Sequence, residues 1–195
     1  MYLYFLDICK MNFERDLDIY CNLLDKHRIL KYNSNNERKR RLGSVIIQKV
    51  FAKMLLNTDF KLTILDYSQG KPYIKEDITI QYNISHCGNM VVGVLHDKPI
   101  GIDIIDKSIY INMLDEKFWH PKEQEQINTG AINKHILWTQ IEAYTKCRGT
   151  GITDLDNREF YILNNMVYND GIIDAKYSIY GCNIDKYYIS ICVAK

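Results

Sequence analysis

The sequence predicts an α+β protein, a pseudo-dimer of two similar α+β halves. Its 195 residues have room for one large domain or for two small ones packed together. A composition of 47% hydrophobic and 25% charged residues is typical of a globular chain. Apolar strands and amphipathic helices occur in the order strand, helices, strands, and this order is then repeated. We therefore predict halves that span residues 1–98 and 99–195.

The first half begins with a strand and continues with helices. Tyr2–Leu6 is a short apolar run typical of a strand, and Arg15–Leu30 has apolar residues at helical spacing. Residues 31–36 have the polar composition of a turn, and they lead into the charged run Glu37–Arg41. From there a helix is expected to continue to about Leu56. Its buried stripe should consist of Leu42, Val45, Ile46, Val50 and Met54.

The centre of the chain alternates between turns and strands. Ser68–Pro72 has the composition of a turn. The runs Thr79–Ile84 and Met90–Leu95 predict two strands on either side of a loop at Ser85–Asn89. Another strand is expected at Ile100–Ile105.

The second half repeats the same sequence of elements. Pro121 suits the first turn of a helix, because its missing N–H would be unpaired there in any case. A longer helix is predicted over His135–Arg148, and Gly149 is a common helix terminator. Alternating apolar and polar residues predict antiparallel strands at Glu159–Leu163, Lys176–Tyr180 and Tyr187–Val193.

Charge and cysteine content exclude several classes of protein. The net charge is +1, whereas a dedicated nucleic-acid-binding domain is expected to be strongly basic. The six cysteines show neither CxxC pairs nor zinc-ligand spacing, so we expect reduced thiols. The first 20 residues lack the pattern of a signal peptide, and no window approaches the roughly 20 apolar residues of a membrane span. We therefore expect a cytoplasmic protein without membrane or nucleic-acid partners.

The segment 82–89 places Ser85 and His86 next to a glycine at the end of a predicted strand. A hydroxyl, an imidazole and backbone N–H groups can together bind an anion. The alternative is a capped turn without a ligand. A Ser–His hydrolase is disfavoured, because adjacent side chains of a strand point in opposite directions.

Two further segments carry charged residues in apolar surroundings. Asp103 lies in the apolar run 99–105, where an unpaired carboxylate is costly and requires a cation, a metal or a donor. Glu142 and Lys146 are four residues apart and share one helix face with Trp138. The alternatives are a structural salt bridge for Asp103 and a solvated ion pair on the helix.

Together, these segments predict a Mg²⁺-dependent enzyme that acts on a polyphosphate. Asp103 and Glu142 supply the oxygen ligands that Mg²⁺ prefers, and phosphate and water usually complete its shell. Lys146, Lys71 and His86 could meet further phosphate charge.

Five motifs in order and at suitable spacing resemble those of the Sfp-type 4′-phosphopantetheinyl transferases. They are Gly70–Tyr73, Asn83–His86, Ile100–Asp103, Phe118–Glu123, and Trp138–Lys146 followed by Gly149–Gly151. The resemblance extends from about Lys39–Gly43 to the C-terminal strand. It implies a monomeric pseudo-dimer fold with coenzyme A and Mg²⁺ in a cleft between the two halves. It also implies transfer of 4′-phosphopantetheine from coenzyme A to a serine of an apo acyl- or peptidyl-carrier protein, with release of 3′,5′-ADP.

The resemblance also implies roles for individual residues. Asp103 and Glu142 would bind Mg²⁺, Lys146 would stabilise the phosphate under attack, and Glu142 or a bound water would deprotonate the carrier serine. These three residues are the candidate catalytic group. Coenzyme A would contact Lys39, Lys71, Ser85 and His86.

The sequence departs from the family pattern at two positions. Ile105 stands where the family commonly has a second acid, and Ile141 where it tends to have a lysine. Asp106 cannot replace the acid, because neighbouring strand residues face opposite ways. Glu123 matches the acidic residue of the middle motif. Two rival functions are a non-catalytic homologue that binds coenzyme A or a carrier protein, and a phosphotransferase acting on free nucleotides. The second rival lacks a GxxxxGK[ST] loop.

Overall fold

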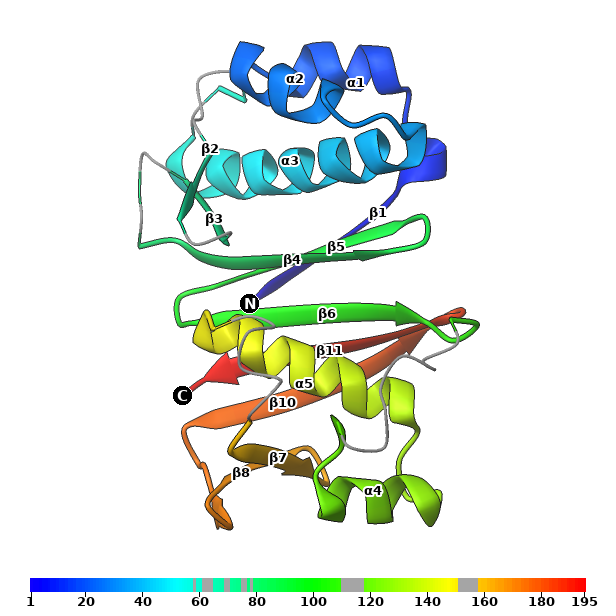
Figure 1. Ribbon diagram of the computed structural model, residues 1–195. Helices are drawn as coiled ribbons and strands as arrows, with labels where there is room; N and C mark the ends of the chain where they lie inside the picture. The colour runs from blue at the N-terminus through cyan, green and yellow to red at the C-terminus, as the bar shows by residue number, and fades with distance from the viewer. Residues whose placement is uncertain are drawn as a thin grey trace. The chain divides into compact units, whose positions relative to one another are not determined.

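The computed structural model consists of two compact units, Met1–Asp97 and Lys98–Lys195, each with its own apolar core (Figure 1). It describes residues 1–57, 59–60, 65–68, 71–74, 77, 79–109, 118–150 and 158–195. Both units combine helices with antiparallel sheets, so the predicted α+β class is confirmed. None of the described helices is both long and apolar enough to cross a bilayer.

The first unit contains a three-stranded antiparallel sheet in the order β1-β5-β4 and a separate pair β2-β3. The predicted N-terminal strand and both strands of the central hairpin are present. The elements are β1 (Tyr2–Asp7), a 3₁₀ turn (Ile8–Lys10), α1 (Phe13–Tyr20), α2 (Leu23–Leu30), α3 (Asn35–Leu56), β2 (Leu65–Ser68), β3 (Lys71–Ile74), β4 (Gln81–Cys87) and β5 (Met90–His96).

The predicted single helix over Arg15–Leu30 is wrong, because the chain forms two helices there. A capping box ends the continuity: the Asn22 side chain accepts from the Asp25 N–H at 2.9 Å, and the Asp25 carboxylate accepts from the Asn22 N–H at 3.1 Å. These bonds satisfy two backbone groups at the start of α2. Local side-chain chemistry therefore overrides the apolar spacing that continues through the break.

Helix α3 begins earlier than predicted. Ser34 caps it by accepting from the Glu37 N–H at 3.4 Å, and Glu37 pairs with Arg41 at 2.8 Å one turn later. The polar segment 31–36 is therefore a turn only up to Ser34, and Lys39 lies inside the helix. Leu42, Val45 and Ile46 are buried as predicted, whereas Val50 is half-buried and Met54 is 42% exposed.

The second unit contains a sheet in the order β10-β11-β6 and a smaller one in the order β7-β8-β9. Pro121 occupies the first turn of α4, and Gly149 ends α5 with a φ of 78°, both as predicted. The short strands β8 and β9 were not predicted. The elements are β6 (Ile100–Asp106), α4 (Pro121–Asn128), α5 (Lys134–Arg148), β7 (Phe160–Leu163), β8 (Met166–Asn169), β9 (Ile172–Ile173), β10 (Tyr177–Ile184) and β11 (Tyr187–Ala194).

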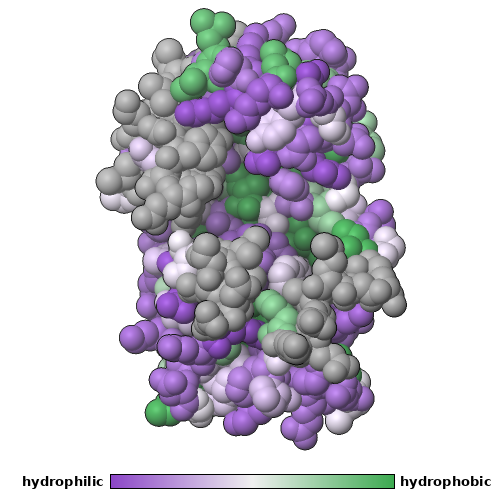
Figure 2. Space-filling model, viewed as in Figure 1, coloured by the Kyte–Doolittle hydropathy of each residue, from purple (hydrophilic) through white to green (hydrophobic). Residues whose placement is uncertain are grey.

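The main sheets of the two units have the same topology. In each, an N-terminal strand (β1 or β6) precedes the long helix (α3 or α5), and a hairpin (β4–β5 or β10–β11) follows it. In each sheet the last strand is central, and the first strand lies antiparallel on its other side. On the surface seen in Figure 2, the described side chains are mainly hydrophilic and apolar residues are scattered, as is usual for a folded protein.

Candidate functional site

In the second unit, one face of β6 carries Gly101, Asp103 and Ile105, because alternate residues of a strand point the same way. This face packs against α5. A Cβ atom on Gly101 would lie 2.0 Å from the Ala143 carbonyl oxygen and 2.4 Å from the Cys147 nitrogen. Glycine therefore lets the helix backbone approach the strand and directs the Asp103 side chain towards α5.

The structure brings Asp103, Glu142 and Lys146 together. Lys146 Nζ lies 2.6 Å from Asp103 Oδ1 and 3.9 Å from Glu142 Oε2. The two carboxylate side chains are less than one-tenth exposed, whereas the lysine side chain is 25% exposed. Two buried acids therefore share one partly exposed ammonium group, and the contact between Lys146 and Asp103 is a salt bridge, the alternative considered for Asp103.

The electrostatics of the cluster favour an additional cation. Burial raises the pKa of Glu142, the nearby Lys146 ammonium opposes this effect, and the Asp103 carboxylate adds to it. Glu142 Oε1 is buried and has no hydrogen-bond partner within the described residues. An orphaned carboxylate oxygen beside a second carboxylate is the kind of donor set that suits Mg²⁺, which prefers oxygen ligands and takes few from protein.

The described residues offer two acids here rather than three. Within the part of the chain that the structure describes, no group of three or more His, Cys, Asp or Glu side chains could hold a metal ion. Ile105 lies on the same face of β6 as Asp103 and is buried. Asp106 points to the other face, where it pairs with Lys186 at 2.6 Å and accepts from the Ser108 N–H at 2.9 Å. As strand alternation predicts, Asp106 does not replace the acid.

Two other motif residues, Ile141 and Glu123, are buried and contribute to the packing of the second unit. Ile141 is fully buried in the apolar core of the second unit, which explains an apolar residue at that position. Glu123 is also fully buried: it forms a capping box with His120, accepts from the Ile162 N–H at 2.8 Å and pairs with Arg158. Glu123 therefore fixes α4 and the start of the following sheet.

In the first unit, Ser85 and His86 lie within β4, so the predicted loop at residues 85–89 is wrong. Both residues pair with β5, opposite Val92 and Val91, and the turn follows at Gly88, whose φ is 56°. Pairing with β5 extends the strand past the polar residues. Ser85 and His86 are consecutive strand residues, so their side chains face opposite ways. This arrangement disfavours a Ser–His hydrolase, as predicted.

His86 lines a cavity of about 420 Å³ formed by residues of α2, α3 and β4. Arg28, Lys31 and Arg41 lend it a basic character, and its other lining residues include Ile29, Val45 and Ile84. No local sequence pattern indicates Arg28, Lys31 and Arg41 as cavity residues, because they come from separate parts of the chain. Lys39 is not among the described residues that line this cavity. The predicted Lys71 begins β3, and its side chain falls outside the described part of the chain.

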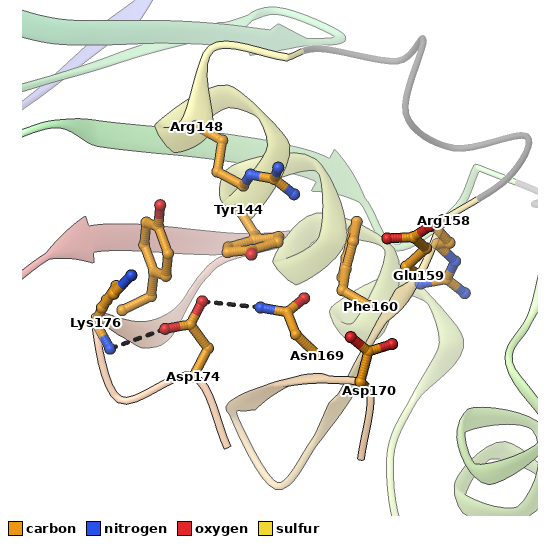
Figure 3. A pocket seen from close by; sticks show the side chains of 10 residues that line it. Tyr144, Arg148, Arg158, Glu159, Phe160, Asn169, Asp170, Asp174 and Lys176 are labelled. Carbon is orange, nitrogen blue, oxygen red and sulfur yellow. Dashed lines mark hydrogen bonds between the residues drawn. The ribbon is translucent and has the colours of Figure 1, made fainter. Parts of the chain in front are cut away.

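A larger cavity of about 530 Å³ lies in the second unit (Figure 3). Its wall combines Arg148, Arg158 and Lys176 with Glu159, Asp170 and Asp174 around aromatic rings. Asp174 accepts from the Asn169 side chain at 2.8 Å and from the Lys176 N–H at 3.1 Å, and Figure 3 shows both bonds along the wall. The charges of this cavity balance, and part of its polar surface is satisfied internally, so the acidic cluster remains the better candidate site.

Comparisons with known proteins relate both units to one family. Residues 12–97 match a family model described as 4′-phosphopantetheinyl transferase, N-terminal, and residues 99–192 match one described as 4′-phosphopantetheinyl transferase superfamily. The chain is 29% identical over 121 residues to the 4′-phosphopantetheinyl transferase psf-1 of Bacillus pumilus, covering 60% of this chain and 52% of the relative. It is 30% identical over 138 residues to the 4′-phosphopantetheinyl transferase gsp of Aneurinibacillus migulanus, covering 68% and 53%. The chain thus spans about half the length of these relatives.

Proposed function

Since the chain belongs to the 4′-phosphopantetheinyl transferase superfamily, we propose that it transfers the 4′-phosphopantetheine moiety of coenzyme A to a serine of an apo acyl- or peptidyl-carrier protein. The reaction releases 3′,5′-ADP. The observation that carries the proposal is the cluster in which Asp103 and Glu142 share Lys146.

The two acids hold Mg²⁺ in this proposal. The donors are the Glu142 oxygen that has no hydrogen-bond partner among the described residues and the neighbouring Asp103 carboxylate. When bound, the ion would neutralise charge on the pyrophosphate of coenzyme A, as metal ions do in phosphoryl transfer.

The side chains of the cluster have separate tasks. The Lys146 ammonium is positioned to stabilise the oxygens of the phosphate under attack. Glu142, or a water bound at the site, accepts the proton of the carrier serine. A bond forms between the serine oxygen and the β-phosphorus as the bond to the 3′,5′-ADP oxygen breaks.

The basic cavity of the first unit supports binding of a phosphate of coenzyme A. His86 lines this cavity, and Arg28, Lys31 and Arg41 add positive charge. Ser85, Lys39 and Lys71 remain candidate contacts for other parts of the ligand. We further propose that the enzyme is monomeric and cytoplasmic. Its six free cysteines are consistent with a reducing compartment.

A second function has one observation in its favour. Ile105 places an apolar side chain beside Asp103 on the face that meets α5, so the site has two acids where the family commonly has three. A non-catalytic homologue that binds coenzyme A or a carrier protein would tolerate this loss. The preserved Asp103, Glu142 and Lys146 cluster favours the enzyme.

Intact-mass spectrometry tests the proposal directly. Apo carrier proteins from fatty-acid, polyketide and non-ribosomal peptide synthesis are incubated with the protein, coenzyme A and Mg²⁺. Transfer adds about 340 Da to the carrier, the mass of the phosphopantetheine arm in this phosphoryl-transfer scheme, and EDTA should abolish the gain. Coenzyme A binding without a mass gain on any carrier would instead support the non-catalytic homologue.

A further inference from the structure

A buried pair of hydroxyl groups lies beside the acidic cluster. Thr139 Oγ1 and Ser190 Oγ are 2.7 Å apart, and the two residues are 0% and 1% exposed. Ser190 on β11 is the cross-strand partner of Asp103, so both side chains project from the same face of the sheet. Thr139 precedes Glu142 by three residues and shares its face of α5. The hydroxyl pair therefore connects α5, which carries Glu142, with β11, the strand that pairs with β6 opposite Asp103.

The two hydrogen bonds of Thr139 Oγ1 can form at the same time with only one arrangement of protons. Thr139 Oγ1 donates its proton to the Ile136 carbonyl oxygen at 2.8 Å, and a carbonyl can only accept. A hydroxyl has one proton, so the bond between the two hydroxyls must be donated by Ser190. Ser190 therefore has no proton left for Asp103 and presents only lone pairs to its other neighbours.

The lone pairs of the Ser190 oxygen can accept a hydrogen bond from a further donor beside the two carboxylates. Among the described residues, the hydrogen bond to Thr139 is the contact recorded for the Ser190 hydroxyl, and there Ser190 is the donor. Buried polar groups are seldom left without a partner. Mg²⁺ keeps several of its waters when it binds protein, and each of those waters carries protons.

We propose that Ser190, oriented by Thr139, is a positioning residue of the cation site and accepts a hydrogen bond from the hydration shell of the bound cation. This inference rests on the cation site of the proposed function. It also addresses the missing third acid. Ile105 lies two residues from Asp103 on the same face of β6 and provides no polar atom, whereas Ser190 provides an oxygen directly across from Asp103.

Binding of Mn²⁺, followed by electron paramagnetic resonance with and without coenzyme A, tests the inference independently of turnover. Ser190→Ala should weaken Mn²⁺ binding about tenfold, the usual effect of removing a partner just outside the metal ligands. Thr139→Val should also weaken it, because the Ser190 proton loses its acceptor and turns towards the carboxylate. Thr139→Ser keeps the acceptor and should bind like the wild type. Adding Ile105→Glu to Ser190→Ala should recover affinity.

Melting temperatures measured without metal identify any variant that fails to fold. Equal Mn²⁺ affinity for the wild type and Ser190→Ala would overturn the inference and leave the proposed function intact. An equal loss in Thr139→Ser and Thr139→Val would also overturn it, because packing rather than the hydroxyl would then matter. A wild type that binds no Mn²⁺, even with coenzyme A, would overturn both the inference and the proposed cation site.

Discussion

The two units have the same sheet topology but arrange buried charge in opposite ways. In the first unit, Asp25 and Lys49 lie 2.5 Å apart with side chains 2% and 0% exposed. In the second, Asp103 and Glu142 share Lys146, whose side chain is 25% exposed. The first arrangement is a closed pair, one acid with one base, and the second has an excess acid and access to solvent.

The difference distinguishes a structural ion pair from the cation site that we propose. Asp25 is also fixed by the capping box of α2, so the closed pair joins α2 to α3. In the second unit, Glu142 Oε1 has no hydrogen-bond partner among the described residues, which suits the cation that we propose for this site. The exposed fractions of the three acids would not by themselves distinguish the two arrangements of charge.

The largest effect should come from breaking the acid pair. Asp103→Asn removes one charged oxygen donor and should lower carrier modification at least about 100-fold, as losing an electrostatic group in an active site does. Asp106→Asn is the matched control: it changes an acid on the same strand that faces the other way and pairs with Lys186. It should retain transfer, measured by intact mass, and equal losses in both variants would contradict the assignment.

The closed pair should determine stability rather than activity. Lys49→Met leaves the Asp25 carboxylate buried without its partner and should lower the free energy of unfolding by about 3–5 kcal/mol. Adding Asp25→Leu should recover much of this loss, because an apolar pair needs no compensation. Lys146→Met should abolish transfer and also destabilise the protein, because two buried carboxylates lose their shared ammonium, but by less than Lys49→Met, since the Lys146 side chain is 25% exposed. Urea unfolding measures each value, and a Lys146→Met effect as large as that of Lys49→Met would remove the distinction.

The helix contacts of the units also differ. A Cβ on Gly93 in β5 would lie 2.4 Å from the Ile47 side chain, which can move, whereas one on Gly101 would meet the backbone of α5 at 2.0 Å. Gly101→Ala should therefore displace α5 and lower the free energy of unfolding by a value at the upper end of about 1–3 kcal/mol. Gly93→Ala should lower it by less. Thermal unfolding and Mn²⁺ binding of both variants test this order. A larger effect for Gly93→Ala would contradict it.

Much of this organisation follows from the sequence. Helical spacing places Glu142 and Lys146 on one face of α5, and the apolar surroundings of Asp103 and Glu142 indicate that these two acids are buried. Pro121 and Gly149 mark helix ends because their backbone preferences are local. Features determined by neighbouring residues are therefore predictable.

The remainder depends on tertiary pairing. The cavity beside His86 takes its basic residues from separate elements, and Ser190 meets Thr139 across 51 positions of sequence. No local pattern gives the register of β6 against β11, which decides that Ser190 lies opposite Asp103. The break at Asn22 was missed for another reason, since apolar spacing continues through a capping box.

The smallest predicted effect concerns pH and links the two kinds of acid. Burial raises the pKa of Glu142 above its ordinary value of 4.5, so the native state binds more protons than the unfolded state just above that pH. Stability without divalent cations should therefore fall as pH rises through this window. Asp106 behaves in the opposite way: hydrogen bonding from Lys186 lowers its pKa from 3.8 to about 2, so its contribution disappears as pH falls through that interval.

Glu142→Gln separates the two contributions. It removes the buried carboxylate charge and should stabilise the protein on the order of 1 kcal/mol near neutral pH, the scale of one poorly satisfied buried group, while abolishing transfer. The acid limb due to Asp106 should remain. Urea unfolding over a pH series in EDTA tests this. If the free energy of unfolding of the variant depended on pH in the same way as that of the wild type, burial of the Glu142 carboxylate would carry no free-energy penalty. A stabilised but inactive Glu142→Gln would instead place the acid pair among sites that sacrifice stability for function.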